Sequence, residues 1–71
     1  MFVNVVWHNS GSPTRTCYEC EKYTVTQRGN ERLSLVLTTL DGDIDVELSG
    51  AAVAYVMNSD GKTIDAVRPK P

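Results

Sequence analysis

Cys17 and Cys20 have the spacing in this chain that most directly suggests chemistry. A C-x-x-C pair can bring two thiolates to one tetrahedral zinc ion, and His8 is the only histidine available to join them. Two residues three apart on a regular strand instead point to opposite faces, one into the core and one toward solvent. We favour this structural interpretation, predict no metal or other cofactor, and keep a zinc-stapled module using Cys17, Cys20 and His8 as an alternative.

A second feature is the alternation of acids at Asp41, Asp43, Asp45 and Glu47. The first three have the spacing that begins a calcium-binding loop, but Val46 stands where that loop requires glycine. On a strand, Asp43, Asp45 and Glu47 share one side and form an acidic row. We predict that this row is solvated and offers an electrostatic contact to a basic partner surface.

Aromatic and basic residues are mixed in one region, at Tyr18, Lys22, Tyr23, Arg28 and Arg32. Small barrels that bind single-stranded nucleic acid use stacking rings beside cationic side chains, so these five residues define an alternative function. Three glutamates are interleaved with them, and the formal net charge is −2. This balance lowers the expectation of phosphate binding, which depends on an excess of lysine and arginine.

Nothing in the sequence identifies an active site. The Gly61-Lys62-Thr63 segment resembles the end of a phosphate-binding loop, but Val56 stands where the earlier glycine is needed. No spacing pairs a nucleophile with a base and an orienting group. We therefore expect no enzymatic activity.

The elements that must position these residues are strands, and the clearest prediction is a hairpin from Arg32 to Ser49. Asp41-Gly42 is a two-residue turn signal, and apolar and polar residues alternate on both sides of it. A turn centred there would pair Thr39 with Ile44, Leu37 with Val46, and Leu35 with Leu48. One face would then carry the apolar residues Leu33, Leu35, Leu37, Ile44, Val46 and Leu48.

The rest of the chain also has strand character. We predict strands at 1–8 and 16–27, the second with a β-bulge near Glu21-Lys22 because its alternation breaks there. A three-residue loop, 28–30, with Asn30 in the left-handed conformation, would place Val25 opposite Leu33. A second hairpin, 52–58 with 62–68, would pair Tyr55 with Ala66 and Met57 with Ile64. A short helix at 16–23 or 50–57 is the alternative for these segments.

These elements predict an all-β fold of six strands, a meander that closes into an SH3-like or OB-like barrel or a compact sandwich. An α+β fold is the alternative if one segment is helical. With 71 residues, 41% hydrophobic and 23% charged, the chain is expected to form one small domain, 1–68, with a frayed tail at 69–71. The sequence shows no signal peptide and no apolar run long enough to span a bilayer, so we expect a cytoplasmic protein without membrane contact.

A core this small cannot bury every apolar residue on both faces of its sheets. The predicted surplus consists of Val36, Ala54, Val56 and Val67, with Phe2 or Val6 as a further candidate, and would form an apolar partner surface. We therefore favour a non-enzymatic protein-interaction module that self-associates. A host protein is a further candidate partner, because freestanding chains this short are often regulators or inhibitors carried by phages or mobile elements. Nucleic acid is the less favoured partner.

Overall fold

The computed structural model describes residues 1–8 and 13–71, and the described chain is all-β. Its strands are β1 (Phe2–His8), β2 (Pro13–Glu19), β3 (Lys22–Gly29), β4 (Arg32–Thr39), β5 (Gly42–Ser49), β6 (Val53–Met57) and β7 (Thr63–Val67). The all-β prediction is confirmed. The alternative of a helix at 16–23 or 50–57 is wrong, because strands occupy most of both segments.

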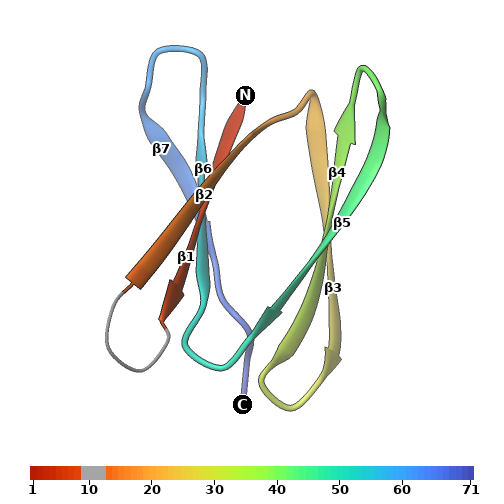
Figure 1. The fold of residues 1–71 in the computed structure, drawn as a ribbon, viewed down its shortest axis with the longest axis vertical. Coiled ribbons are helices and arrows are strands. Elements are labelled where there is room, and N and C mark those ends of the chain that lie inside the picture. Colours follow the sequence, from red (N-terminus) through yellow and green to blue (C-terminus); the bar gives the residue numbers. More distant parts are fainter. Residues whose placement is uncertain (9–12) are drawn as a thin grey trace.

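The strands form two antiparallel sheets, which Figure 1 shows side by side. The four-stranded sheet has the order β2-β1-β6-β7, and the three-stranded sheet is the meander β3-β4-β5. No pairing among the described strands closes either sheet into a barrel. The N-terminal and C-terminal hairpins therefore join through β1 and β6, with the meander inserted between them in sequence.

The predicted single strand at 16–27 is two strands in different sheets. The break comes at Cys20 and Glu21, whose neighbouring amides donate to opposite sheets. Cys20 N–H donates to the carbonyl of Met1 (3.0 Å), and Glu21 N–H donates to that of Thr38 (2.8 Å). The lost alternation thus marks a crossing between sheets, visible at the top of Figure 1, and not a bulge.

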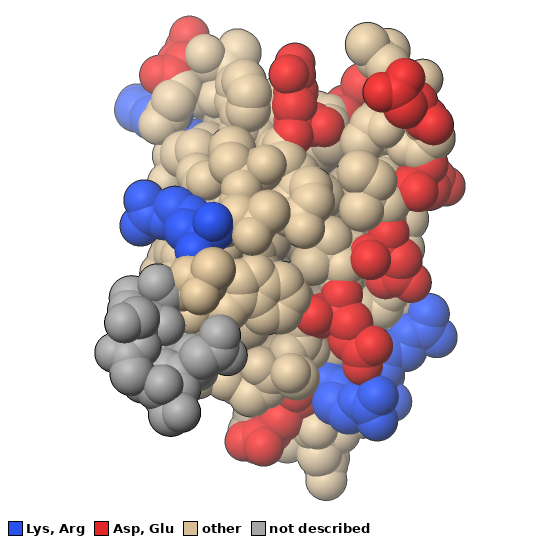
Figure 2. Space-filling view, in the orientation of Figure 1, with Lys and Arg blue, Asp and Glu red and all other residues tan. Residues whose placement is uncertain are grey.

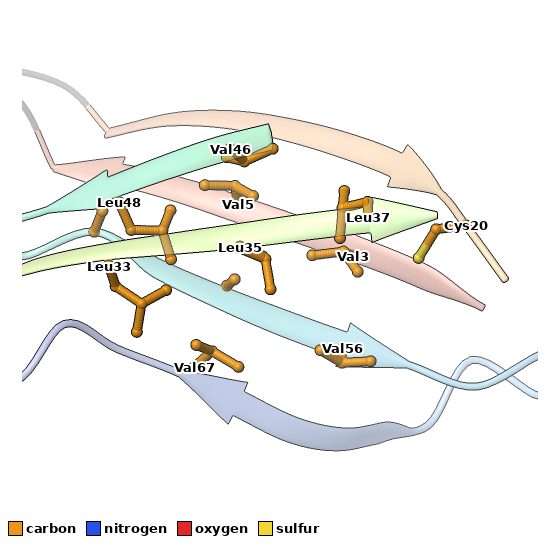
Figure 3. Close-up of a cluster of buried hydrophobic side chains, with 12 residues drawn as sticks. Val3, Val5, Cys20, Leu33, Leu35, Leu37, Val46, Leu48, Val56 and Val67 are labelled. Carbon is orange, nitrogen blue, oxygen red and sulfur yellow. The ribbon is translucent and has the colours of Figure 1, made fainter. Parts of the chain in front are cut away.

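The inner faces of the two sheets share one core, drawn in Figure 3. Leu35 and Leu37 of β4 are fully buried, as are Val3 and Val5 of β1. Period-2 alternation explains this, because every second residue of a strand faces the opposite sheet. The other buried members of the cluster are Cys20, Leu33, Val46, Leu48, Ala52, Ala54, Val56 and Val67.

The hairpin of β4 and β5 has the predicted faces but a register shifted by two residues. Leu37 lies opposite Ile44, and Leu35 lies opposite Val46. The turn uses Leu40 and Asp41, because the Thr39 side chain organises it: Oγ1 donates to the carbonyl of Gly42 (2.7 Å) and accepts from the Asp41 amide (3.1 Å). Side chains alternate between the two faces of a strand, so a shift of two residues leaves each side chain on its predicted face. The predicted apolar face is therefore correct although the predicted register is wrong.

The turn between β3 and β4 also differs from its prediction. Val25 lies opposite Leu35, and the pairing shifts between Gln27 and Gly29. The left-handed residue is Glu31 (φ 58°), not Asn30. Tertiary contacts explain this, since the Glu31 amide donates to the carbonyl of Lys70 (2.7 Å) and its carbonyl accepts from the Gly50 amide (3.0 Å).

The last hairpin is partly as predicted. Tyr55 lies opposite Ala66, but Met57 pairs with Thr63 in place of Ile64, because the register shifts between Val56 and Met57. After β7, Lys70 lies against β3: its carbonyl accepts from the Gln27 side-chain amide (3.0 Å), and its amide donates to Gln27 Oε1 (3.4 Å).

Candidate interaction surface

The two cysteines lie in different environments. Cys17 is exposed on β2 opposite Asn4, whereas Cys20 is buried just after the strand. The side chain of His8 lies outside the described residues, and its backbone is four residues from Asn4, roughly 13 Å along β1. Within the part of the chain that the structure describes, no three histidines, cysteines or carboxylates gather as metal ligands would.

The Cys20 thiol is not an activated one. Burial raises its pKa above the ordinary value of 9.0, and the nearby N-terminal ammonium of Met1 opposes that shift more weakly. A raised pKa disfavours the thiolate, which is the form that binds metals and attacks electrophiles. Cys20 therefore acts as a small core residue.

The residues of the nucleic-acid hypothesis lie in three places. Lys22 and Arg32 belong to the outer face of the three-stranded sheet, and Arg28 lines the same depression as Arg32. Tyr23 lies on the inner side of β3, where its hydroxyl donates to Asp65 of β7 (2.8 Å). Tyr18 is in the other sheet and packs against the core. The aromatic rings are thus not on the surface that carries the basic side chains.

The acidic row follows β5, as the red side chains of Figure 2 show. Two of its members have partners on β4. The Arg32 guanidinium contacts Glu47 (2.9 Å), and the Ser34 hydroxyl donates to Asp45 Oδ1 (2.6 Å). Asp43 lies opposite Thr38 on the same side. Arg28, Arg32, Ser34, Asp45 and Glu47 line an open depression of about 540 Å³, so the face presents both charge signs.

The predicted apolar partner surface is mostly wrong. Ala54 and Val56 are fully buried, Val67 is 7% exposed, and only Val36 remains half-buried on an outer face. The prediction placed the wrong side of β6 toward solvent. The pairing of β6 with β1 places Ala54 beside Val5, which turns that side of β6 toward the core.

The opposite side of the four-stranded sheet exposes an apolar surface. Its members are Phe2 (37% exposed), Ile64 (55% exposed) and the half-buried Val6, Tyr55 and Met57. We call these five residues the outer apolar face. Phe2 lies directly opposite Met57 in neighbouring strands.

One polar residue interrupts this face. Asn4 lies opposite Tyr55 at its centre, and its amide nitrogen donates to Met57 Sδ (3.6 Å). Charged Arg15 and Glu19 flank the face on β2, where they lie opposite Val6 and Phe2. An apolar centre with a charged rim is the usual composition of a protein interface.

The signal for this surface was present in the sequence. The strand at 1–8 carries apolar residues on both parities, with Phe2 and Val6 on one side and Val3 and Val5 on the other. The sequence does not reveal the order of the strands in the sheet, and this order decides which side of each strand faces the core.

No helix of the described residues has the length and apolar character that crossing a membrane requires. Comparison of the chain with protein-family models, with curated proteins and with solved structures found no match.

Proposed function

We propose that this chain is a non-enzymatic protein-interaction module that self-associates through its outer apolar face. The observation that supports this proposal is the contrast between the two outer faces. The outer side of the three-stranded sheet carries an ion pair and hydroxyls, whereas that of the four-stranded sheet carries Phe2, Val6, Tyr55, Met57 and Ile64.

The size of the face sets the expected affinity. Three strands about 4.8 Å apart, each presenting about 17 Å of length, give roughly 250–300 Å² per copy. Two copies would bury roughly 500–600 Å², well below the 1,200–2,000 Å² or so of stable complexes. We therefore expect a weak, concentration-dependent dimer in which two sheets pack face to face about a twofold axis.

A surface this small also suits a partner of another kind. A host protein with a flat apolar surface would occupy the same five residues, so binding to it would compete with self-association. Under the regulator hypothesis, a host protein and a second copy of the chain would therefore compete for the outer apolar face.

The test is an Ile64→Glu variant with Leu40→Glu as its matched control. Ile64 is 55% exposed within the face, and Leu40 is 90% exposed in the turn after β4, outside it. Both changes add the same charge at an exposed position, so both proteins should fold. Sedimentation equilibrium up to about 1 mM should show the same average mass for the wild type and Leu40→Glu at each concentration, and a lower average mass for Ile64→Glu, because its contact through the outer apolar face should weaken at least about tenfold.

Two outcomes would contradict the proposal. One is a wild-type protein that stays monomeric over the whole concentration range. The other is equal weakening by both substitutions, which would show that added negative charge, and not loss of the apolar contact, controls association.

A further inference from the structure

Each sheet has two edge strands, whose outer backbone groups are unpaired within their sheet and can accept another strand. Three of the four edges are obstructed. The β3 and β7 edges meet at a seam where Tyr23 donates to Asp65 and Lys70 lies against Gln27. The β5 edge carries the acidic row, so a second copy of the same strand would be repelled.

Among the described residues, nothing obstructs the β2 edge in this way. Its residues Arg15, Cys17 and Glu19 are exposed, and its only paired neighbour among the described strands is β1. The direction of its backbone groups follows from the ladder. Cys20 N–H donates to Met1, directly opposite in the β1–β2 register, so alternate residues turn the other way. The N–H and C=O groups of Arg15, Cys17 and Glu19 therefore point away from β1.

The side chains along this edge are self-complementary. Arg15 and Glu19 lie two residues to either side of Cys17. If a second β2 strand approaches antiparallel with Cys17 opposite Cys17, each Arg15 lies opposite the Glu19 of the other copy. On the other side of the same pairing, Thr16 lies opposite Tyr18, a favourable cross-strand combination.

Other registers lose this match. Backbone hydrogen bonds form only where outward-pointing N–H and C=O groups of the two copies face each other. The allowed registers are therefore those in which the twofold axis passes through a residue of β2. An axis at Thr16 places Glu19 opposite Pro13, which has no N–H to donate. An axis at Arg15 or Glu19 places like charges opposite each other, and an axis at Tyr18 places Glu19 opposite Cys17, which leaves the Glu19 charge unpaired. The axis at Cys17 alone pairs both charges and uses every outward amide from Arg15 to Glu19.

We propose that a second copy of this chain pairs along β2, antiparallel and in the Cys17 register, and joins two four-stranded sheets into one sheet of eight strands. Three residue pairs that exchange two bonds each give about six backbone hydrogen bonds. The pairing also brings the outer apolar faces of the two copies onto one continuous surface. It goes beyond the proposed face-to-face contact, uses different residues, and does not depend on it.

Charge exchange tests the register. Arg15→Glu gives a β2 strand with two glutamates, and Glu19→Arg gives one with two arginines, so each variant alone should raise the dissociation constant at least about tenfold. The double variant Arg15→Glu/Glu19→Arg restores the opposite charges and should recover the dimer. Mixing the two single variants should produce a heterodimer, detected by native mass spectrometry.

These outcomes separate the edge from other contacts. Failure of the double variant to recover, or absence of the heterodimer, would overturn the Cys17 register. Ile64→Glu, which disrupts the outer apolar face, should leave the edge dimer of the wild type intact. Loss of association in Ile64→Glu with no effect of either charge variant would support the face alone and overturn the edge.

Cross-linking gives an independent readout of the same geometry. In a Cys20→Ser background, Cys17 is the sole thiol, and the register places two Cys17 residues about 5.5 Å apart between Cα atoms. A short bis-maleimide should join the two copies, and Arg15→Glu in the same background should reduce the yield. A Cys17→Ser/Leu40→Cys/Cys20→Ser protein, with its thiol in the turn after β4, is the matched control. Equal cross-linking from position 40 would contradict the proposal.

Discussion

The Tyr23 hydroxyl donates a 2.8 Å hydrogen bond to the Asp65 carboxylate, and this bond joins β3 of one sheet to β7 of the other. It closes the side of the core where the two sheets meet along their edges. Both residues belong to edge strands, so the bond ties together two elements that have no backbone pairing with each other.

This bond predicts a dependence of stability on alkaline pH. Donation to Asp65 is the main cause that raises the Tyr23 pKa above 10.0, followed by burial and the carboxylate charge. The folded state therefore holds the phenolic proton more tightly, and the stabilisation is complete below pH 10 and lost as the pH rises through the raised pKa. Tyr23→Phe should lower the free energy of unfolding by about 0.5–1 kcal/mol at pH 7 and reduce its decline above pH 10.

Urea unfolding between pH 7 and pH 11 measures this effect, with Tyr18→Phe as the control. Cys20, whose pKa is also raised, contributes a decline above pH 9 in every variant, so the comparison rests on the difference between proteins. A Tyr23→Phe protein with the same alkaline slope as the wild type would rule out the hydrogen bond as the cause.

The core predicts a large difference between neighbouring residues of β4. Leu35 is fully buried, whereas Val36 faces outward and is half-buried. Leu35→Ala should cost about 2–5 kcal/mol, because it removes buried methyl groups and leaves a cavity. That is comparable with the entire stability of a domain this size, so the variant should be largely unfolded.

Val36→Ala is the matched control and should remain folded, with a loss near 1 kcal/mol or less. Far-ultraviolet circular dichroism with thermal unfolding distinguishes the two variants. Similar losses at both positions would contradict the placement of β4 with Leu35 inward.

Two glycines give a test of backbone conformation. Gly61 has a φ of 82° after the β6 strand, in the region that a side chain disfavours. Gly61→Ala should therefore cost about 1 kcal/mol, although no atom lies within 4 Å of the added Cβ. The equally open Gly29, whose φ lies outside that region, should accept alanine without loss or with a small gain. Chemical denaturation of both variants measures the contrast, and equal effects would be inconsistent with the turn.

Local pattern was enough to predict much of the meander. Alternation at Leu33, Leu35 and Leu37 identified the buried side of β4, because a strand has only two faces. The exact turn was not predictable from Asp41-Gly42 alone. Thr39 competes for the same position through its side chain, and either turn keeps the same residues inside.

The surface was harder to predict because it depends on sheet order. In β6, Ala54 and Val56 alternate with Tyr55 and Met57, so both sides are apolar and the pattern does not favour either one. The pairing with β1, about fifty positions away in sequence, decides which side is buried. The acidic row was visible from spacing, but its partners Arg32 and Ser34 required the true register.

The central position of β1 has a consequence for biosynthesis. β1 is synthesised before the other strands of its sheet, yet one of its two neighbours, Val53–Met57, is made about forty-five residues later, a delay of roughly 2–9 s at usual elongation rates. The meander can complete its own pairing in that interval, because it ends at Ser49. The nascent β1–β2 hairpin must wait with one side of β1 unsatisfied, which makes that hairpin the segment that a chaperone would shield.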